Sequence, residues 1–263
     1  MNKKQFEKEY SAFCNQLTNI VCDKSKHWTI KGFIDINKNI YTISQDTKII
    51  SKILEIHIFP EIINFAEKNE FDVILTDHQN YYPDISFVYK KNTSIKYAVD
   101  IKTTFTKGNN KAGFTLGSHG TYFINRNSTK NIQFPYSQYK AHFVLGILYE
   151  RNEKADEYTV YKFSNLDKIN SVIKNMQFFF TEKWKIASDK QGSGNTANIG
   201  SVTNVEDLKN GAGPFTKYKN GEKLFDEYWM NYKKISVTDK NGNVTKINTL
   251  DDFLKYKGDK QCQ

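Results

Sequence analysis

The chain has 263 residues, of which 38% are hydrophobic and 14% aromatic, so it can bury a core and is not intrinsically disordered. It carries 38 Lys and Arg against 29 Asp and Glu, a net charge of +9, which favours nucleic acid as a partner before an anionic membrane, although a merely basic protein has the same excess. No apolar run reaches the roughly 18 residues of a membrane span, no signal peptide is apparent, and three cysteines form no disulfide or zinc pattern, so we expect a cytoplasmic protein with no membrane partner.

The first seventy residues are predicted to form a helix, a hairpin and a second helix. Apolar residues recur at helical spacing over 2–21, and two β-rich runs within 27–44 flank a turn at 37–39. Asp46 is expected to cap a long helix over about 47–69, with Pro60 as a candidate kink.

Strands dominate the middle of the chain. β-rich apolar runs predict them at 71–76, 84–90, 94–102 and 142–150, with further candidates at 158–163 and 176–187. The last third is expected to hold one helix, over 222–232, followed by a Lys-rich tail. No repeat or long linker divides the chain, so the predicted fold is a single α/β (α+β) domain with a central mixed β-sheet flanked by helices.

Two acids and a lysine form the strongest chemical pattern. Asp84 follows Pro83 at the start of one predicted strand, and Asp100 and Lys102 lie near the end of the next. Since strand side chains alternate, Asp100 and Lys102 share a face, and a hairpin would bring Asp84 to Asp100. Two carboxylates suit Mg²⁺, and Lys102 can orient or deprotonate a water or neutralise charge on a phosphate. The pattern therefore indicates metal-assisted phosphodiester hydrolysis.

Such short patterns also arise by chance. In the alternative interpretation, Asp84 is only a turn residue and residues 100–102 are the solvated end of a strand. Against this, the acids follow residues of buried type, where unpaired carboxylates are costly, and Glu55 supplies a third acid. Glu55 shares one stripe of its predicted helix with Lys48 and Ser51, which by itself is typical of a solvated face.

A Gly-rich stretch, DKQGSGNTANIGS, occupies 189–201. It lacks the P-loop and dinucleotide-binding spacings, so alone it indicates an ordinary surface loop. Its glycines would let backbone groups approach base edges, where Asn195 can pair with adenine and Thr196 can pack against a thymine methyl. With only two arginines in the chain, Arg126 and Arg151, base reading is expected from Asn, Thr and backbone groups.

Six blocks, in chain order, resemble the EcoRV-like type II restriction endonucleases of the PD-(D/E)xK nuclease superfamily. They are SQDTKIIS (44–51), QNYYPD (79–84), VDIKTTFT (99–106), FTLG (114–117), STKNI (128–132) and GSGNTANIGS (192–201), with a fainter match at FDEYWMNY (225–232). The resemblance implies a restriction-endonuclease-like fold. Its DNA-binding and catalytic subdomain would comprise about 44–140 and 176–263, and its smaller dimerisation subdomain about 27–43 and 155–172.

The resemblance also implies roles for individual residues. Asp84, Asp100 and Glu55 would be catalytic acids that bind Mg²⁺, and Lys102 the catalytic lysine. Base recognition would fall to Gln79 and Asn80 in the minor groove and, in the major groove, to Gly192, Ser193, Gly194, Asn195 and Thr196. The residues that contact or support the DNA backbone and the loop would be Lys48, Thr103, Thr104, Lys130 and Asn198.

The implied activity is that of a bacterial homodimer that cuts double-stranded DNA at a short palindrome. Blunt cleavage of GATATC leaving 5'-phosphates is expected, with a host DNA methyltransferase as functional partner. Ala197 departs from the family, which has threonine there, and 117–127 is about two residues longer. Two alternatives stay open: another PD-(D/E)xK nuclease, in DNA repair or junction resolution, and a non-catalytic DNA-binding protein.

Overall fold

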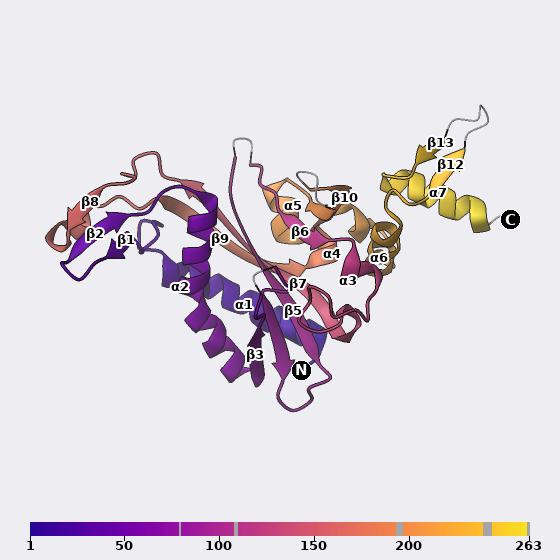
Figure 1. The fold of residues 1–263 in the computed structure, drawn as a ribbon, viewed down its shortest axis with the longest axis horizontal. Coiled ribbons are helices and arrows are strands. Elements are labelled where there is room, and N and C mark those ends of the chain that lie inside the picture. The colour runs from indigo at the N-terminus through magenta and orange to yellow at the C-terminus, as the bar shows by residue number, and fades with distance from the viewer. Residues whose placement is uncertain (79, 108–109, 193–196, 239–243, 262–263) are drawn as a thin grey trace.

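A five-stranded mixed sheet runs through the centre of the computed structural model, which describes residues 1–78, 80–107, 110–192, 197–238 and 244–261 (Figure 1). In spatial order its strands are β3 (Phe71–Leu75), β4 (Ile85–Tyr89), β5 (Lys96–Phe105), β7 (Tyr139–Arg151) and β9 (Ile173–Glu182). Neighbouring strands are antiparallel except β5 and β7, which are parallel. The predicted α/β domain with one central mixed sheet is confirmed.

Two long helices pack on one side of this sheet and form a first hydrophobic core with it. Helix α1 (Lys3–Val21) buries its apolar stripe, including Phe6 and Tyr10, and helix α2 (Thr47–Lys68) continues through Pro60. The side chain of Asp46 caps α2 by accepting hydrogen bonds from the Lys48 and Ile49 N–H groups, as predicted. No helix in the described ranges is long and apolar enough to span a membrane.

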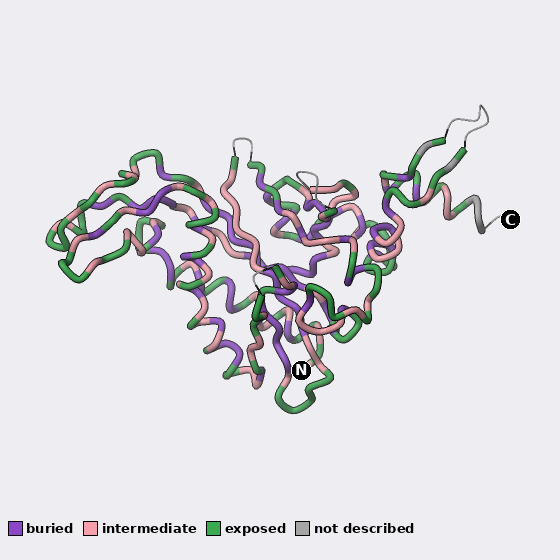
Figure 2. The backbone as a smooth tube through the Cα atoms, viewed as in Figure 1, coloured by how far each residue is buried: buried purple, intermediate pink, exposed green. Residues whose placement is uncertain are grey.

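The opposite side of the sheet carries a second core, built largely from the C-terminal half (Figure 2). A small sheet in the order β10-β11-β6 contributes to it. The elements around this second core are β6 (Thr115–Ser118), α3 (Thr121–Ile124), η1 (Tyr136–Gln138), α4 (Lys183–Ile186), β10 (Ala187–Gln191), β11 (Asn198–Ser201), α5 (Val205–Asn210), η3 (Pro214–Lys217) and α6 (Gly221–Asn231). This core supports β10 and β11, which flank the Gly-rich stretch.

A third sheet projects from one end of the molecule (Figure 1). It consists of β1 (Gly32–Ile34), β2 (Asn39–Thr42) and β8 (Val160–Lys162), followed by η2 (Phe163–Lys168). The predicted hairpin is confirmed, and Lys38 in its turn has a positive φ of 60°.

The last third of the chain differs from its prediction. Only the first part of 176–187 continues strand β9; Lys183–Ile186 forms a single helical turn, after which β10 begins. The tail is not merely Lys-rich, since a hairpin of β12 (Ser236–Thr238) and β13 (Val244–Lys246) precedes helix α7 (Leu250–Gln261). Apolar residues of this tail, such as Ile247 and Phe253, join the second core. Helix α6 confirms the predicted helix over 222–232, whereas the expectation of a single helix in this third was wrong, because α5 and α7 are present as well.

Candidate active site

The pairing of β4 with β5 brings the two predicted acids together. Ile85 pairs with Val99 in an antiparallel register, so Asp84 lies across from Asp100. The backbone N–H of Ile101 donates a 2.6 Å hydrogen bond to Asp84 Oδ2. Asp100 lies in the middle of β5 rather than near its end, because the strand continues to Phe105 alongside β7.

Lys102 points to the same side of β5 as Asp100. Its Nζ lies 2.6 Å from Asp100 Oδ2, and Asp100 is buried. This agrees with the expected alternation, in which Ile101 points to the other side. Because Asp100 is buried, water competes little for this ion pair, which holds Lys102 beside the two carboxylates.

The pKa values of Asp84 and Lys102 are shifted because both groups lie close to Asp100. Asp84 is exposed as a residue, yet its carboxyl group faces Asp100, and removal from water together with the Asp100 charge raises the pKa of Asp84 to about 7. Burial alone would lower the pKa of Lys102, but Asp100 and Asp84 outweigh it and the pKa is raised. Two hard oxygen ligands that repel each other suit a divalent cation, so these residues fit a metal of the Mg²⁺ type.

Glu55 lies on α2, in the wall of a cleft that Asp84 also lines. It lines a cleft of about 870 Å³ between α2 and the sheet, together with Lys48, Asp84 and Ile101, and its carboxylate pairs with Lys52 at 2.7 Å. Because Ile101 points into this cleft, Asp100 and Lys102 face the other way. Across the described ranges no three His, Cys, Asp or Glu side chains form a group that could hold a metal. The structure therefore assembles two of the three expected acids and leaves Glu55 on the cleft wall.

Comparison with known proteins identifies the family. The family model described as "Restriction endonuclease EcoRV" matches residues 24–258. The chain belongs to this family. It is also 38% identical to the type II restriction enzyme EcoRV of Escherichia coli over 236 residues, which cover 88% of this chain and 94% of that protein. Among solved structures, the NlaIV restriction endonuclease aligns over 87% of each chain with a TM-score of 0.42 and 13% identity.

Membership of the EcoRV family makes the chain a type II restriction endonuclease, a DNA-binding nuclease that cleaves DNA at specific sites. Nucleases of this family typically use a divalent metal, which agrees with the oxygen ligands of Asp84 and Asp100. The alternative of a non-catalytic DNA-binding protein is not supported, because the matching family model and the matching relative are both described as restriction enzymes.

The other predicted site residues of this nuclease lie on several segments. Thr103 and Thr104 follow Lys102 on β5 and are half-buried, whereas Asn80 and Lys130 are exposed in turns. Asn198 begins β11 opposite Ser118 of β6. Gln79 and four loop residues, Ser193, Gly194, Asn195 and Thr196, lie outside the described residues.

Gly192 and Gly200 lie where the strands that flank the Gly-rich loop (residues 192–197) pack closely. A Cβ atom on Gly192 would lie 2.8 Å from Thr115 Cγ2, and one on Gly200 would lie 2.6 Å from the Lys190 carbonyl oxygen. Backbone atoms therefore exclude a side chain at Gly200, whereas a side chain at Gly192 would require Thr115 to move. The Gly192 N–H also donates a 3.0 Å hydrogen bond to the Asn198 carbonyl, which closes the loop.

Sequence reasoning missed a buried lysine behind the acids. Lys183 of α4 is 1% exposed, and its Nζ lies 4.9 Å from the centroid of the Tyr82 ring and 5.7 Å from that of Phe123. Within the described ranges Nζ has no hydrogen-bond partner. Burial lowers the pKa of Lys183 to about 8, against the raising effect of Asp100. Its sequence context, EKWKI, is that of a solvated charge, so no signal marked it.

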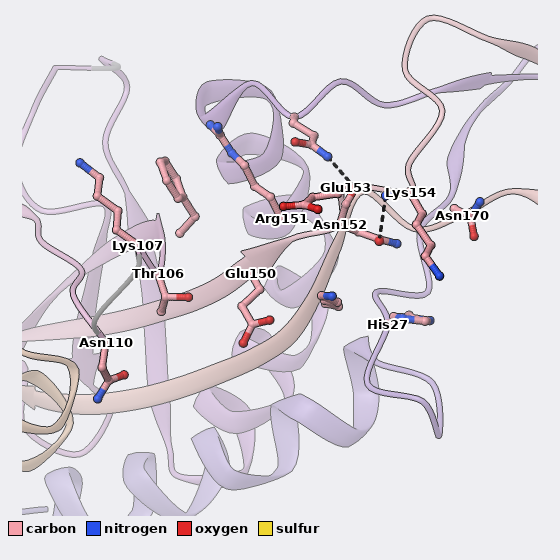
Figure 3. A pocket seen from close by; sticks show the side chains of 13 residues that line it. His27, Thr106, Lys107, Asn110, Glu150, Arg151, Asn152, Glu153, Lys154 and Asn170 are labelled. Carbon is pink, nitrogen blue, oxygen red and sulfur yellow. Dashed lines mark hydrogen bonds between the residues drawn. The ribbon is translucent and has the colours of Figure 1, made fainter.

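A large pocket beside the far end of β5 also escaped prediction. It holds about 1070 Å³, with Lys107 near one end and His27 and Lys154 near the other (Figure 3). Arg151 lines it, with its guanidinium group 4.0 Å from the centroid of the Phe105 ring. The charge of the lining is mixed, because Glu150 and Glu153 lie in the pocket with the cationic side chains.

Proposed function

We propose that this nuclease is a Mg²⁺-dependent homodimer that cuts double-stranded DNA at GATATC, leaving blunt ends with 5'-phosphates. The observation that carries the catalytic part is the meeting of Asp84, Asp100 and Lys102 on β4 and β5. The site sequence is supported by 38% identity to EcoRV.

Asp84 and Asp100 would hold Mg²⁺, which when bound supplies a Lewis acid for the scissile phosphate and lowers the pKa of a bound water. Removal from water and the neighbouring Asp100 charge raise the pKa of Asp84, which favours a protonated Asp84 carboxyl while no cation is bound. Lys102, fixed 2.6 Å from Asp100, neutralises negative charge that develops on the phosphate and orients the attacking water. Glu55 is proposed as an additional acid whose charge acts from the wall of the cleft.

Base reading is assigned to Asn80 and Gln79 in the minor groove and to residues 192–196 in the major groove. Lys48, Thr103, Thr104 and Lys130 would contact the DNA backbone, and Asn198 would support the loop. The central TA step need not be touched, since pyrimidine–purine steps bend easily and can be read through their deformability.

The proposed dimer uses the projecting β1-β2-β8 sheet. Apolar side chains are exposed on and beside it: Phe33 at 54%, Ile34 at 57%, Ile36 at 98%, Val160 at 54% and Phe163 at 51%. A patch of this kind favours a protein partner over water. A second copy of the chain would give a two-fold assembly, which matches the symmetry of a palindrome. A host methyltransferase that protects the same site completes the proposal.

Digestion of a plasmid of known sequence with Mg²⁺, followed by sequencing of the ends, tests the proposal. We expect blunt ends at the centre of one six-base palindrome. Asp84→Asn and Lys102→Met proteins should each lose at least about 10³-fold in cleavage rate, because each removes a charge that acts at the phosphate. Lys219→Ala, at an exposed position far from the acids in sequence, serves as the control.

Random nicking by the wild type would overturn site-specific cleavage, and cuts at another palindrome would overturn GATATC alone. Full activity of Asp84→Asn would show that the site has been assigned wrongly.

A further inference from the structure

His119 links the two stems of the Gly-rich loop. Its backbone N–H donates a 2.9 Å hydrogen bond to the carbonyl oxygen of Ala197, at the C-terminal stem. Its ring Nε2 lies 3.0 Å from Nε2 of Gln191, the last residue of β10 and hence of the N-terminal stem. One residue therefore bonds to both sides of the loop through different atoms.

The ring of His119 is itself held in place. It is 8% exposed and packs against Trp229, whose ring centroid is 5.2 Å away, and Tyr232, at 5.5 Å. Trp229 is completely buried in the second core. Helix α6, which carries Trp229, also supports β10 directly, since the Tyr228 hydroxyl donates a 2.6 Å hydrogen bond to the Asp189 carbonyl. The link to Gln191 thus starts from a rigid support.

The hydrogen bonds define the protonation state of the ring. Lys233 Nζ donates to Gln191 Oε1 at 3.1 Å, so the Gln191 amide nitrogen is the group that faces His119. An amide nitrogen only donates, so His119 Nε2 must accept and the ring must be neutral, with its proton on Nδ1. Burial and the positive charges of Lys234 and Lys233 lower the pKa of His119, which favours this neutral form.

We propose that His119, through Gln191 and Ala197, is a positioning residue for DNA-sequence discrimination, which fixes the two stems from which the loop reads the bases. The inference rests on the proposed role of residues 192–196 in base reading. Hydrogen bonds to base edges discriminate only when donors and acceptors are held in place, and ordering a loose loop on binding lowers affinity for the correct site. Fixed stems reduce that loss. Discrimination should then depend on a residue that does not itself contact DNA.

The test compares cleavage rates at the site that the wild type is found to cut with rates at sites altered in one outer base pair. Gln191→Leu removes the hydrogen bonds and keeps the bulk of the side chain, and His119→Phe keeps the ring packing without the acceptor. Each should lower the ratio of the two rates about tenfold, the value of roughly one hydrogen bond. The double variant should be no worse than either single variant, because both remove the same bond. At about pH 8, where the ring is neutral with or without this charge, Lys234→Met removes a nearby charge that is not bonded to Gln191 and should leave the ratio unchanged.

A pH series separates positioning from a merely structural role. The charged groups that face the ring are Lys233 and Lys234, from the chain that follows α6, whereas β10 presents the neutral Gln191. As the pH is lowered through the depressed pKa of His119, the wild-type ratio should fall, because a protonated ring cannot accept from the amide. Because the same catalytic acids cut both substrates, their titration changes both cleavage rates equally and leaves the ratio of the rates unaffected. Gln191→Glu should show the reverse trend, since its carboxylate pairs with the protonated ring, and His119→Phe should show no trend.

Unchanged ratios in His119→Phe and Gln191→Leu, or a pH trend of the wild type that persists in His119→Phe, would overturn the inference. So would a change of preference at bases outside the site in Gln191→Leu alone, which would show that Gln191 contacts DNA directly. Failure of the proposed function is distinguishable from these results, because the wild type would then cut no defined site.

Discussion

Asp84 and Asp100 face each other at a separation that destabilises the folded protein whenever both are ionised. The pKa of Asp84 is about 7 in the fold against an ordinary value of 3.8, because of its removal from water and the neighbouring carboxylate. The folded state therefore binds a proton over a range in which the unfolded chain does not. Stability from this group is complete below about pH 4 and is lost as the pH rises to about 7.

We accordingly expect Asp84→Asn to be more stable than the wild type at about pH 8 in metal-free buffer. The free energy of unfolding should rise by about 1 kcal/mol, since solvent screening at an exposed residue removes most of the full linkage value. At about pH 4 the two proteins should be equally stable, because the carboxyl is then protonated. Urea denaturation at both pH values measures the difference.

Mg²⁺ should reduce this difference, because it stabilises the wild type by binding the carboxylates and has weaker ligands in the variant. Asp72→Asn is the matched control, since Asp72 is exposed and its nearest cation is 3.8 Å away, at Lys90. A variant less stable than the wild type at about pH 8 would contradict the expectation. A gain in stability on removing a catalytic acid would mean that the active site is maintained at some cost to the fold.

Helix α1 precedes the segment that the family model matches, yet it supplies much of the first core. Phe6 is completely buried, stacks on Tyr97 at a centroid distance of 4.3 Å and makes edge contacts with Phe71 and Phe87. These rings belong to β3, β4 and β5; Asp84 directly precedes β4, and Asp100 lies on β5. The helix is therefore part of the support of the active site.

Phe6→Ala should lower the free energy of unfolding by about 3–5 kcal/mol, because it leaves a cavity among aromatic rings that cannot close over it. Thermal or urea denaturation measures the change, and Lys4→Ala, on the exposed face of the same helix, should alter stability by less than about 0.5 kcal/mol. Similar losses in the two variants would show that α1 is peripheral.

At this scale the sequence predicted the long elements and missed the short ones. The strands of the central sheet are apolar runs bounded by turns, and the alternation along β5 was sufficient to place Lys102 beside Asp100. The turn at Lys183–Ile186 has only four residues, so tertiary packing rather than local preference decides its conformation. The bond between Gln191 and His119 joins residues 72 apart, and no periodicity reports such a pair. The sequence placed Glu55 on its helix correctly. Its position relative to Asp100 could not be predicted, because that depends on which face of β5 is turned toward the helix.

In the part of the chain that the structure describes, about half of the exposed large apolar side chains lie where a second copy is proposed to dock. Ile36, 98% exposed in the hairpin of the projecting sheet, is the most accessible of them. Ile36→Lys should weaken the homodimer, because it places a charge where an apolar contact is expected. Sedimentation velocity over a concentration series measures the effect, with Val244→Lys, another exposed apolar position at 66%, as control.

If Ile36→Lys lowers the dimer affinity, nicked plasmid should accumulate during digestion, since the two strands would be cut in separate events. An identical association constant in wild type, Ile36→Lys and Val244→Lys would place the interface elsewhere.

The second core connects the loop to the catalytic residues. Ala187 and Ile199 in the loop stems belong to it, together with Trp229 and Tyr82. Asp100 and Lys102 face the side of the sheet that carries this core, and Ala98, on the same face of β5, is part of it. A substitution beneath the loop that gives a descendant of this chain a new target should therefore also change the packing behind the acids, so that target and cleavage rate evolve together.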